Sequence, residues 1–234
     1  MMIEGAISVK SAIQNGKREI IKVYIDKDKK TKDFNYIRKL IRSLNIPCLE
    51  CDREELSSLL TGKSHGGIGA EVGERRDDCF DDTDIFYLDG IEDPFNLGYA
   101  IRTLYALGVK NVLLSRRDYS KMEAQLLKSS AGAYDMINLR ISEDPLKEIG
   151  GFKKQGYFIY SLYRGEKAKD IFDVTFENKA LFMLGGEKRG ISSELLELSD
   201  EELFISYGSD FRNALNACGA LDVVVTLLRK QRRS

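Results

Sequence analysis

The sequence predicts an α/β protein with two domains, the second of which is a mostly parallel sheet covered by helices on both faces. Beyond residue 85, short apolar runs alternate with segments of helical periodicity, which is typical of parallel strands joined by helices. A shorter alternation of the same kind occupies residues 1–73. Between the two, residues 74–84 (ERRDDCFDDTD) form a short charged stretch that we expect to be a linker. The second domain is therefore expected to span residues 85–234.

Three strands and two helices are expected in the first domain. Residues 20–25 (IIKVYI) are β-branched and aromatic, as in a strand. Apolar side chains at helical spacing follow from Phe34 to Leu44. Asp52 and Glu55 resemble a capping box that opens a second helix. The expected strands are 20–25, 47–51 and 66–72, and the expected helices are 34–44 and 52–60.

The second domain is expected to alternate more regularly. Its expected strands are 85–88, 109–114, 135–141, 157–162, 180–184 and 203–206. Its expected helices are 96–107, 120–130, 145–155, 191–198 and 212–230.

Composition excludes several classes of function. No apolar run approaches the ~20 residues that cross a bilayer, and no signal peptide is visible, so we expect a cytoplasmic protein without membrane contact. His65 is the only histidine, which excludes a histidine-based triad or a multi-histidine metal site. Cys48 and Cys51 form a single C-x-x-C pair without a second pair, so no metal is expected.

Charge is unevenly distributed along a chain whose net charge is −1. Residues 1–45 carry eleven Lys and Arg against five Asp and Glu, a balance of +6, whereas residues 46–90 carry four against twelve, a balance of −8. The basic first segment permits RNA contact on one face, but a solvated helix face explains the same charge equally well.

Two glycine-containing strand ends in the last 55 residues are candidate ligand-binding loops. The apolar run from Leu181 to Leu184 stops at Gly185 and Gly186, and Glu187 follows. A second run, 203–205, opens on a polar loop before the last helix. Open α/β sheets bind ligands at such strand ends, although ordinary β–α turns have the same pattern.

A third strand end lies upstream, in residues 88–107 (LDGIEDPFNLGYAIRTLYAL). We expect a helix from about Asn96, which is a good N-cap type. Gly98 and Arg102 complete an N-x-G-x-x-x-R pattern. Arg102 lies six residues after Asn96, about 120° around the helix, and projects from an otherwise apolar stripe.

Together these segments resemble the SpoU family of RNA ribose 2′-O-methyltransferases. The resemblance rests on N-x-G-x-x-x-R at 96–102, L-G-x-E-x-x-G-I at 184–191 and A-L-N at 214–216, which occur in the family's order over about 150 residues. It implies that S-adenosylmethionine is held in a C-terminal trefoil knot, and that the first domain is an α/β/α sandwich that binds the RNA substrate, rRNA or tRNA. It also implies a homodimer.

The resemblance further implies roles for individual residues. The backbone around Leu184, Gly185, Gly186, Ile205 and Leu215 would cradle the cofactor. The implied catalytic residues are Asn96, Arg102, Glu187 and Asn216. Because a guanidinium stays protonated, Arg102 is suited to stabilise the attacking oxygen or to grip a phosphate, not to accept the proton.

Three departures from the family pattern bear on activity. The usual I-P-x-x-G is Ile205-Ser206-Tyr207-Gly208 here, the following loop is one residue longer, and Ala214 replaces the usual serine of S-L-N. An RNA-binding pseudoenzyme with the same fold is therefore the alternative to an active methyltransferase. A nucleotide-binding regulatory module is a more remote one.

Overall fold

The computed structural model describes residues 1–60, 65–186 and 190–233. It has the predicted α/β architecture, with a seven-stranded parallel sheet and a separate four-stranded sheet near the N-terminus. The chain forms two compact units. Unit 1 contains Met1–Arg76 and Tyr119–Met136, and unit 2 contains Asp77–Asp118 and Ile137–Ser234.

Unit 1 is built on a four-stranded sheet in the order β1-β4-β2-β3, and only the β2–β3 pair is parallel. The side chains of Val23 and Ile25 in β2 are buried on one face. Tyr24, between them, packs on the opposite face against the α3 cluster. The strands are β1 (Met2–Glu4), β2 (Ile20–Asp26), β3 (Cys48–Cys51) and β4 (Ile68–Val72), and the helices are α1 (Ala6–Asn15), α2 (Lys32–Ser43), α3 (Arg53–Leu59) and α5 (Glu123–Ser129).

The first strand and the first helix are absent from the sequence-based prediction. Helix α1 buries Val9, Ala12 and Ile13, which are spaced as one helical stripe. Strand β1 is only three residues long, and its Ile3 is completely buried. The capping box predicted at Asp52 and Glu55 is confirmed, because both of its reciprocal hydrogen bonds are present.

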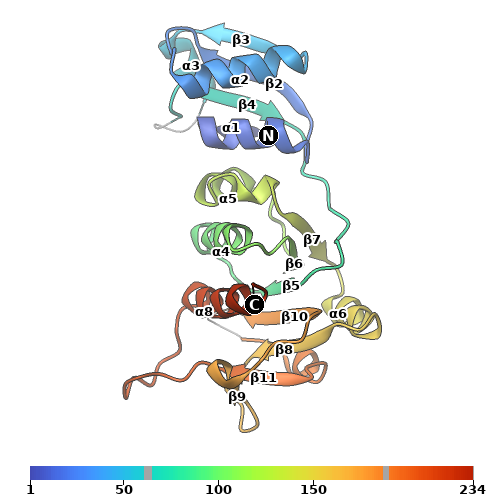
Figure 1. The fold of residues 1–234 in the computed structure, drawn as a ribbon. Coiled ribbons are helices and arrows are strands. Elements are labelled where there is room, and N and C mark those ends of the chain that lie inside the picture. Colours follow the sequence, from blue (N-terminus) through green and yellow to red (C-terminus); the bar gives the residue numbers. More distant parts are fainter. Residues whose placement is uncertain (61–64, 187–189, 234) are drawn as a thin grey trace. The chain divides into compact units, whose positions relative to one another are not determined.

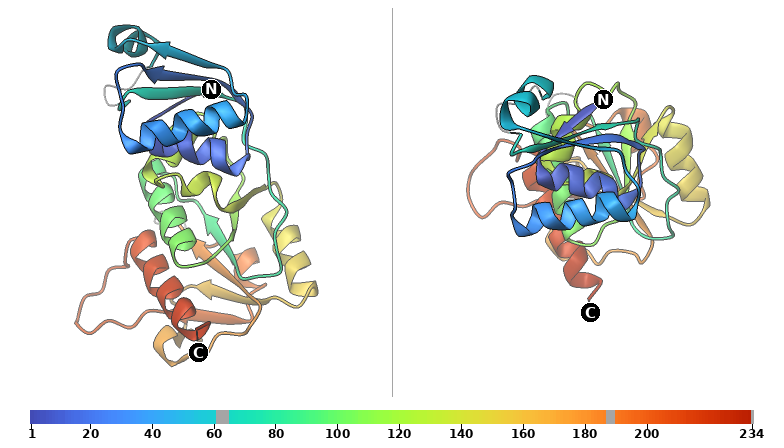
Figure 2. Two further views of the ribbon diagram at one scale, coloured as in Figure 1. Left: turned by 45° about the horizontal axis from the view of Figure 1, so that its top comes forward. Right: turned by 90° about the horizontal axis from the view of Figure 1, so that it is seen from above.

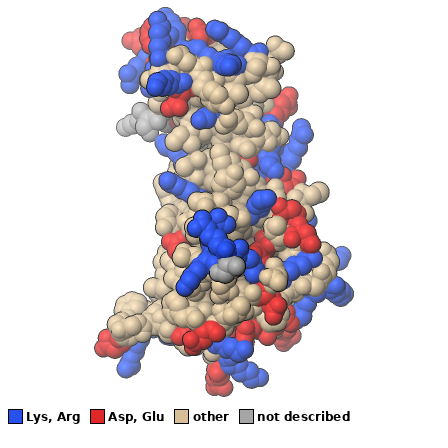
Figure 3. All heavy atoms as spheres, in the orientation of Figure 1, with Lys and Arg blue, Asp and Glu red and all other residues tan. Residues whose placement is uncertain are grey.

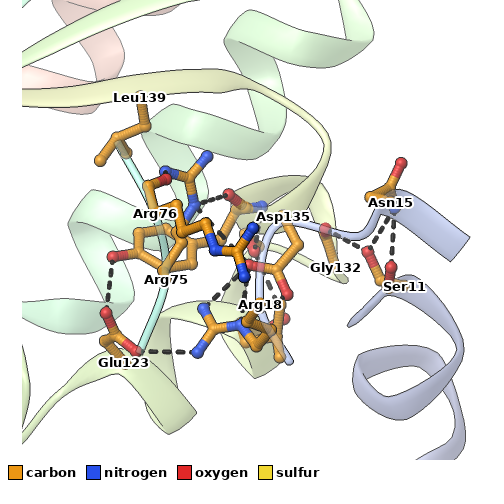
Figure 4. A network of polar contacts seen from close by, with 12 residues as sticks. Ser11, Asn15, Arg18, Arg75, Arg76, Glu123, Gly132, Asp135 and Leu139 are labelled. Atoms are coloured by element: carbon orange, nitrogen blue, oxygen red, sulfur yellow. Dashed lines mark hydrogen bonds and ion pairs between the residues drawn. The ribbon is translucent and has the colours of Figure 1, made fainter. Parts of the chain in front are cut away.

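A buried ion network joins the residues after α1 to the segment Tyr119–Met136 within unit 1 (Figure 4). Arg18 donates from Nε to both carboxylate oxygens of Asp135 and from a terminal nitrogen to Oδ1 at 2.9 Å. Its other terminal nitrogen reaches Glu123 at 2.9 Å. The side chains of Arg18 and Asp135 are both 0% exposed. Desolvation alone would lower the pKa of Arg18, but the hydrogen bonds and charges of Asp135 and Glu123 outweigh it and raise the pKa.

Unit 2 is organised around a parallel sheet in the order β7-β6-β5-β10-β8-β11-β9 (Figures 1 and 2). The central strand β10 pairs with β5 on one side and β8 on the other. The strands are β5 (Ile85–Asp89), β6 (Asn111–Ser115), β7 (Asn138–Ser142), β8 (Phe158–Leu162), β9 (Lys169–Asp170), β10 (Ala180–Gly185) and β11 (Glu201–Phe204). The helices are α4 (Pro94–Ala106), α6 (Pro145–Lys154), α7 (Ser193–Leu196) and α8 (Ala217–Gln231).

Both faces of this sheet are buried. Helices α6 and α7 cover one face, where Tyr87 and Met183 belong to the same core cluster. Helices α4 and α8 contact each other on the opposite face. The rings of Phe86, Phe182 and Tyr160 stack there across three adjacent strands, with centroids 4.9 and 5.2 Å apart. The near-continuous apolar strands predicted from the sequence follow from this double burial.

Helices α4 and α8 begin at residues other than those predicted. Helix α4 starts at Pro94 and not at Asn96, because the Asp93 side chain caps it by accepting the N–H groups of Phe95 and Asn96. Helix α8 starts at Ala217 and not near Arg212. Residues 208–216 form an exposed loop instead.

The segment before β5 is tied to the sheet by Asp81. Its carboxylate accepts a hydrogen bond from the buried Asn111 side chain at 2.8 Å. Burial would raise the pKa of Asp81, but hydrogen bonds from Thr83 and Asn111 and the charge of Lys110 lower it. Across the described ranges 1–60, 65–186 and 190–233, no helix is long and apolar enough to span a membrane.

Candidate active site

A pocket of about 380 Å³ opens at the carboxyl ends of β10, β8 and β11. All five residues expected to hold a cofactor line it: Leu184, Gly185, Gly186, Ile205 and Leu215. They come from two strand ends and from the loop before α8, which the parallel sheet brings to one edge. The pocket suits a ligand of nucleoside size because it is concave and mainly apolar.

Gly185 and Gly186 form a floor that only glycine permits. A Cβ at Gly185 would lie 2.3 Å from the carbonyl carbon of Gly190, and one at Gly186 would lie 2.3 Å from the oxygen of Gly90. The chain doubles back here, since Gly190 N–H donates to the oxygen of Gly186 at 3.0 Å. The loops after β5 and β10 are therefore in backbone contact, and any larger residue would separate them.

A smaller pocket of about 180 Å³ lies beside the first, at the end of β5 and the start of α4. Asn96 lines it, together with Gly90, Asp93 and other residues of that loop. Gly186 and Ala217 line both pockets, so the two spaces are adjacent. Asn96 is thus placed next to the floor of the larger pocket.

Asn216 lies at the start of α8 and is its N-cap. Its Oδ1 accepts the N–H of Cys218 at 2.8 Å. The thiol of Cys218 in turn donates to the backbone carbonyl oxygen of Asn96 at 3.2 Å. Asn216 therefore has a structural role as a helix cap, and this role places the two asparagines at neighbouring helix starts.

Arg102 and Asn216 are not among the described residues that line these two pockets. Arg102 is exposed on α4. It lies seven residues after Phe95 and three after Tyr99, on the exposed side of the same helix. Glu187 lies outside the described residues.

Sequence reasoning missed the contribution of β8 and of Tyr207. Arg164, just beyond β8, lines the large pocket with its guanidinium 5.2 Å from the Tyr207 ring and 5.9 Å from the Phe204 ring. The Tyr207 hydroxyl accepts the N–H of Leu215 at 3.1 Å, which closes the loop on itself. The sequence signal for these two residues was their position just after the predicted strands 157–162 and 203–206. This signal is weak, because many solvated side chains occupy the same position.

Ser206 fixes the position of the chain after β11, where the family pattern has a proline. Its side chain and backbone N–H both hydrogen-bond to Asp170 of β9 and lower the pKa of that carboxyl. A proline has neither of these donors. The departure therefore comes with a local replacement that ties β11 to β9.

The electrostatic character of the large pocket is positive. Arg164 and Arg212 are the cations among its lining residues, and no carboxylate is found in the described part of the lining. A pocket of this kind suits a ligand with a carboxylate or phosphate beside an aromatic or apolar body.

Comparison with known proteins gives a consistent result for both parts of the chain. Residues 84–226 match the SpoU rRNA Methylase family, and residues 2–77 match the domain described as RNA 2'-O ribose methyltransferase substrate binding. The chain is 25% identical to the 23S rRNA (guanosine-2'-O-)-methyltransferase RlmB of Xanthomonas campestris, over 98% of this chain and 96% of that protein.

Solved structures share the fold over nearly the whole chain. The SpoU methyltransferase AviRb from Streptomyces viridochromogenes, in complex with AdoMet, superimposes with a TM-score of 0.79 at 19% identity, over 100% of this chain and 91% of that one. An AdoMet-bound rRNA methyltransferase from Sinorhizobium meliloti gives a TM-score of 0.79 at 16% identity, over 99% and 87%.

Proposed function

The chain belongs to the SpoU rRNA methylase family, and we propose that it transfers a methyl group from S-adenosylmethionine to a ribose 2′-hydroxyl of RNA. The observation that supports this most directly is the glycine-floored pocket, where all five residues expected at the cofactor converge. The mainly apolar lining of this pocket fits an adenosine body. When bound, the cofactor supplies an electrophilic methyl group on a sulfonium centre.

The residues of this chain would hold and align the two reactants. The backbones of Leu184, Gly185 and Ile205 are placed to grip the cofactor, and Leu215 covers it. Asn96, in the adjoining pocket, lies on the acceptor side. Alignment of an attacking oxygen with a methyl group accounts for several kcal/mol of barrier lowering by itself.

Arg102 is assigned to the acceptor as a fixed positive charge. Its guanidinium stays protonated, so it stabilises the developing negative charge on the 2′-oxygen or binds the neighbouring phosphate in a bidentate manner. We assign Glu187 to the positioning of the Asn96 loop, and Asn216 to hydrogen bonding at the methyl-transfer centre.

A homodimer accounts for the exposed face of α4. Phe95, Tyr99 and Tyr105 are 60%, 48% and 41% exposed on this single helix, which is unusual for aromatic side chains of one short segment. We propose that a second copy covers this face. Arg102 lies within it, so its contribution to methyl transfer should depend on the dimer.

We assign RNA binding to residues 1–73, the linker to 74–84 and methyl transfer to 85–234. Lys and Arg side chains gather around α2 (Figure 3), where Lys32, Lys39 and Arg42 are exposed. Ribosomal RNA is the substrate that the relatives' names favour, with tRNA as the second possibility. We further propose that the second domain contains a trefoil knot and that the protein acts in the cytoplasm.

The test combines cofactor binding with methyl transfer. Isothermal titration should show S-adenosylmethionine binding by the wild type, and the labelled methyl group should appear on riboses of RNA from cells that lack the gene. Arg102→Ala should reduce transfer by at least ~10²-fold, as expected for the loss of one preorganised charge, with little change in cofactor affinity. Arg116→Ala, another exposed arginine of unit 2, is the matched control and should retain activity.

Two results would revise the proposal. A wild-type protein that binds the cofactor and RNA but transfers no methyl group would be a pseudoenzyme, the alternative that the replacement of the usual serine by Ala214 left open. A wild type that does not bind S-adenosylmethionine would remove the assignment of the glycine-floored pocket.

A further inference from the structure

Three planar side chains follow one another at the mouth of the large pocket. The Arg164 guanidinium lies over the Tyr207 ring, and the Tyr207 ring lies 6.0 Å from the Phe211 ring at an interplanar angle of 45°. Arg164 and Tyr207 line the pocket, whereas Phe211 is not among its described lining residues. Phe211 is 52% exposed, and every residue from 208 to 216 is exposed.

The fold explains Tyr207 but not Phe211. Tyr207 is half-buried and accepts the N–H of Leu215, so it closes the loop between β11 and α8. Phe211 has a ring contact with Tyr207 and is 52% exposed. Leaving an aromatic ring exposed forgoes much of the stabilisation that its burial would provide, which suggests that something else covers it.

We propose that Phe211, backed by Tyr207 and Arg164, is the stacking surface for the nucleobase of the RNA nucleotide that is methylated. This inference rests on the proposed function. A nucleotide whose ribose reacts in a pocket must leave its neighbours in the RNA, and unstacked bases are commonly held on aromatic rings or guanidinium planes. Such contacts contribute about 1–3 kcal/mol per base.

Charge and position favour an RNA base over the adenine of the cofactor. Arg164 lies over the Tyr207 ring, and Arg212 is a second cation among the residues that line the pocket, so the site carries positive charge that a phosphate backbone would meet. The adenosine is assigned to the interior between Gly185, Ile205 and Leu215, whereas Phe211 lies beyond the lining. Phe211 lies in the loop whose length was expected to depart from the family pattern by one residue.

Phe211→Leu tests the planar ring while keeping an apolar side chain of similar size. It should raise the KM for RNA by roughly 5- to 150-fold, which is the fold-change equivalent of the loss of one stacked base. The Kd for S-adenosylmethionine should stay within about two-fold of the wild-type value, because the ring lies outside the cofactor wall. Phe211→Tyr keeps the plane and should retain the wild-type KM.

Phe172→Leu is the matched control, since Phe172 is also strongly exposed, at 55%, and does not line the described part of the pocket. It should change neither constant. The proposal is wrong if Phe211→Leu retains the wild-type KM for RNA, or if it weakens cofactor binding to the same extent. It is also wrong if the KM change comes only with a loss of dimer in light-scattering measurements.

A second measurement does not depend on turnover. The probe is a single-stranded 12-nucleotide RNA with 2-aminopurine at its centre, whose fluorescence is quenched by stacking on an aromatic ring. The wild type and Phe211→Tyr should quench it, and Phe211→Leu should quench it far less. Equal quenching by all three proteins would overturn the stacking surface, even for a protein that transfers no methyl group.

Discussion

Replacing Arg18 with methionine should destabilise unit 1 far more than its position after a surface helix would suggest. The change keeps most of the length of the side chain but removes the charge that faces Asp135. That carboxylate is 0% exposed and would retain the Nε of Arg75, at 3.7 Å, as its cationic partner among the described residues. Breaking a buried pair from one side costs about 3–5 kcal/mol, because the remaining charge is desolvated without compensation.

Urea unfolding followed by circular dichroism should report this loss as a lower transition midpoint. Arg116→Met is the matched control, because Arg116 pairs with Glu143 at 2.9 Å while both side chains are more than 70% exposed. An exposed pair contributes at most about 1 kcal/mol, so this variant should unfold nearly as the wild type does. Hydrogen exchange should accelerate over residues 119–136 in Arg18→Met and not in the control.

A double-mutant cycle isolates the interaction itself. Asp135→Leu alone leaves the buried Arg18 with Glu123 as its ion-pair partner in the described part of the chain, so it should also destabilise. The double variant should be less destabilised than the sum of the single ones by about 1–3 kcal/mol, because neither charge is then left alone. Additive effects, or a loss in Arg18→Met no larger than in Arg116→Met, would refute the reasoning.

Three further predictions concern the site and the acid stability of unit 2. Gly186→Ala should abolish cofactor binding measured by titration calorimetry while the circular dichroism spectrum is retained, because the new Cβ separates two loops outside the core. Ala214→Ser should raise turnover if a hydroxyl helps to align the acceptor, with a stability change under ~1 kcal/mol; an unchanged turnover would show that the longer loop aligns it alone. The pKa of Asp81 is lower in the folded protein than its ordinary value of 3.8, so the ionised carboxylate stabilises the fold at pH values above 3.8. This stabilisation is lost as the pH falls through the lowered pKa. Asp81→Asn should therefore reduce the dependence of the melting temperature on pH in this acidic range.

Apolar periodicity predicted most of the strands and helices because burial on both faces of the sheet leaves a continuous apolar signal. The start of α8 was placed wrongly for a physical reason. Phe211 and Leu215 are four residues apart, as on a helical stripe, yet both are exposed. Helix formation begins only where the Asn216 side chain satisfies the free N–H of Cys218. The Asn216 cap, and not the apolar periodicity, therefore determines where α8 begins.

The contacts that complete the site and unit 1 had little signal in the sequence. Arg18 and Asp135 are 117 positions apart, and no local spacing connects them. Arg164 follows a strand as many solvated arginines do, and only the fold places it over Tyr207. Gly185 and Gly186 were predictable as a turn, whereas the closeness of Gly186 to Gly90 depends on β5 and β10 being neighbours.

The composition of unit 1 has a consequence for synthesis on the ribosome. The first 76 residues cannot complete their unit until residue 136 has emerged, because Asp135 and α5 belong to it. At roughly 5–20 residues per second, the intervening 60 residues (136 − 76) take roughly 3–12 s. Until Asp135 has been synthesised, Arg18 lacks its buried partner, whereas strands β5 and β6 of unit 2 have already been synthesised. The two units therefore fold as interleaved parts of one chain, and the large pocket is complete only after residues 205–220 have left the exit tunnel.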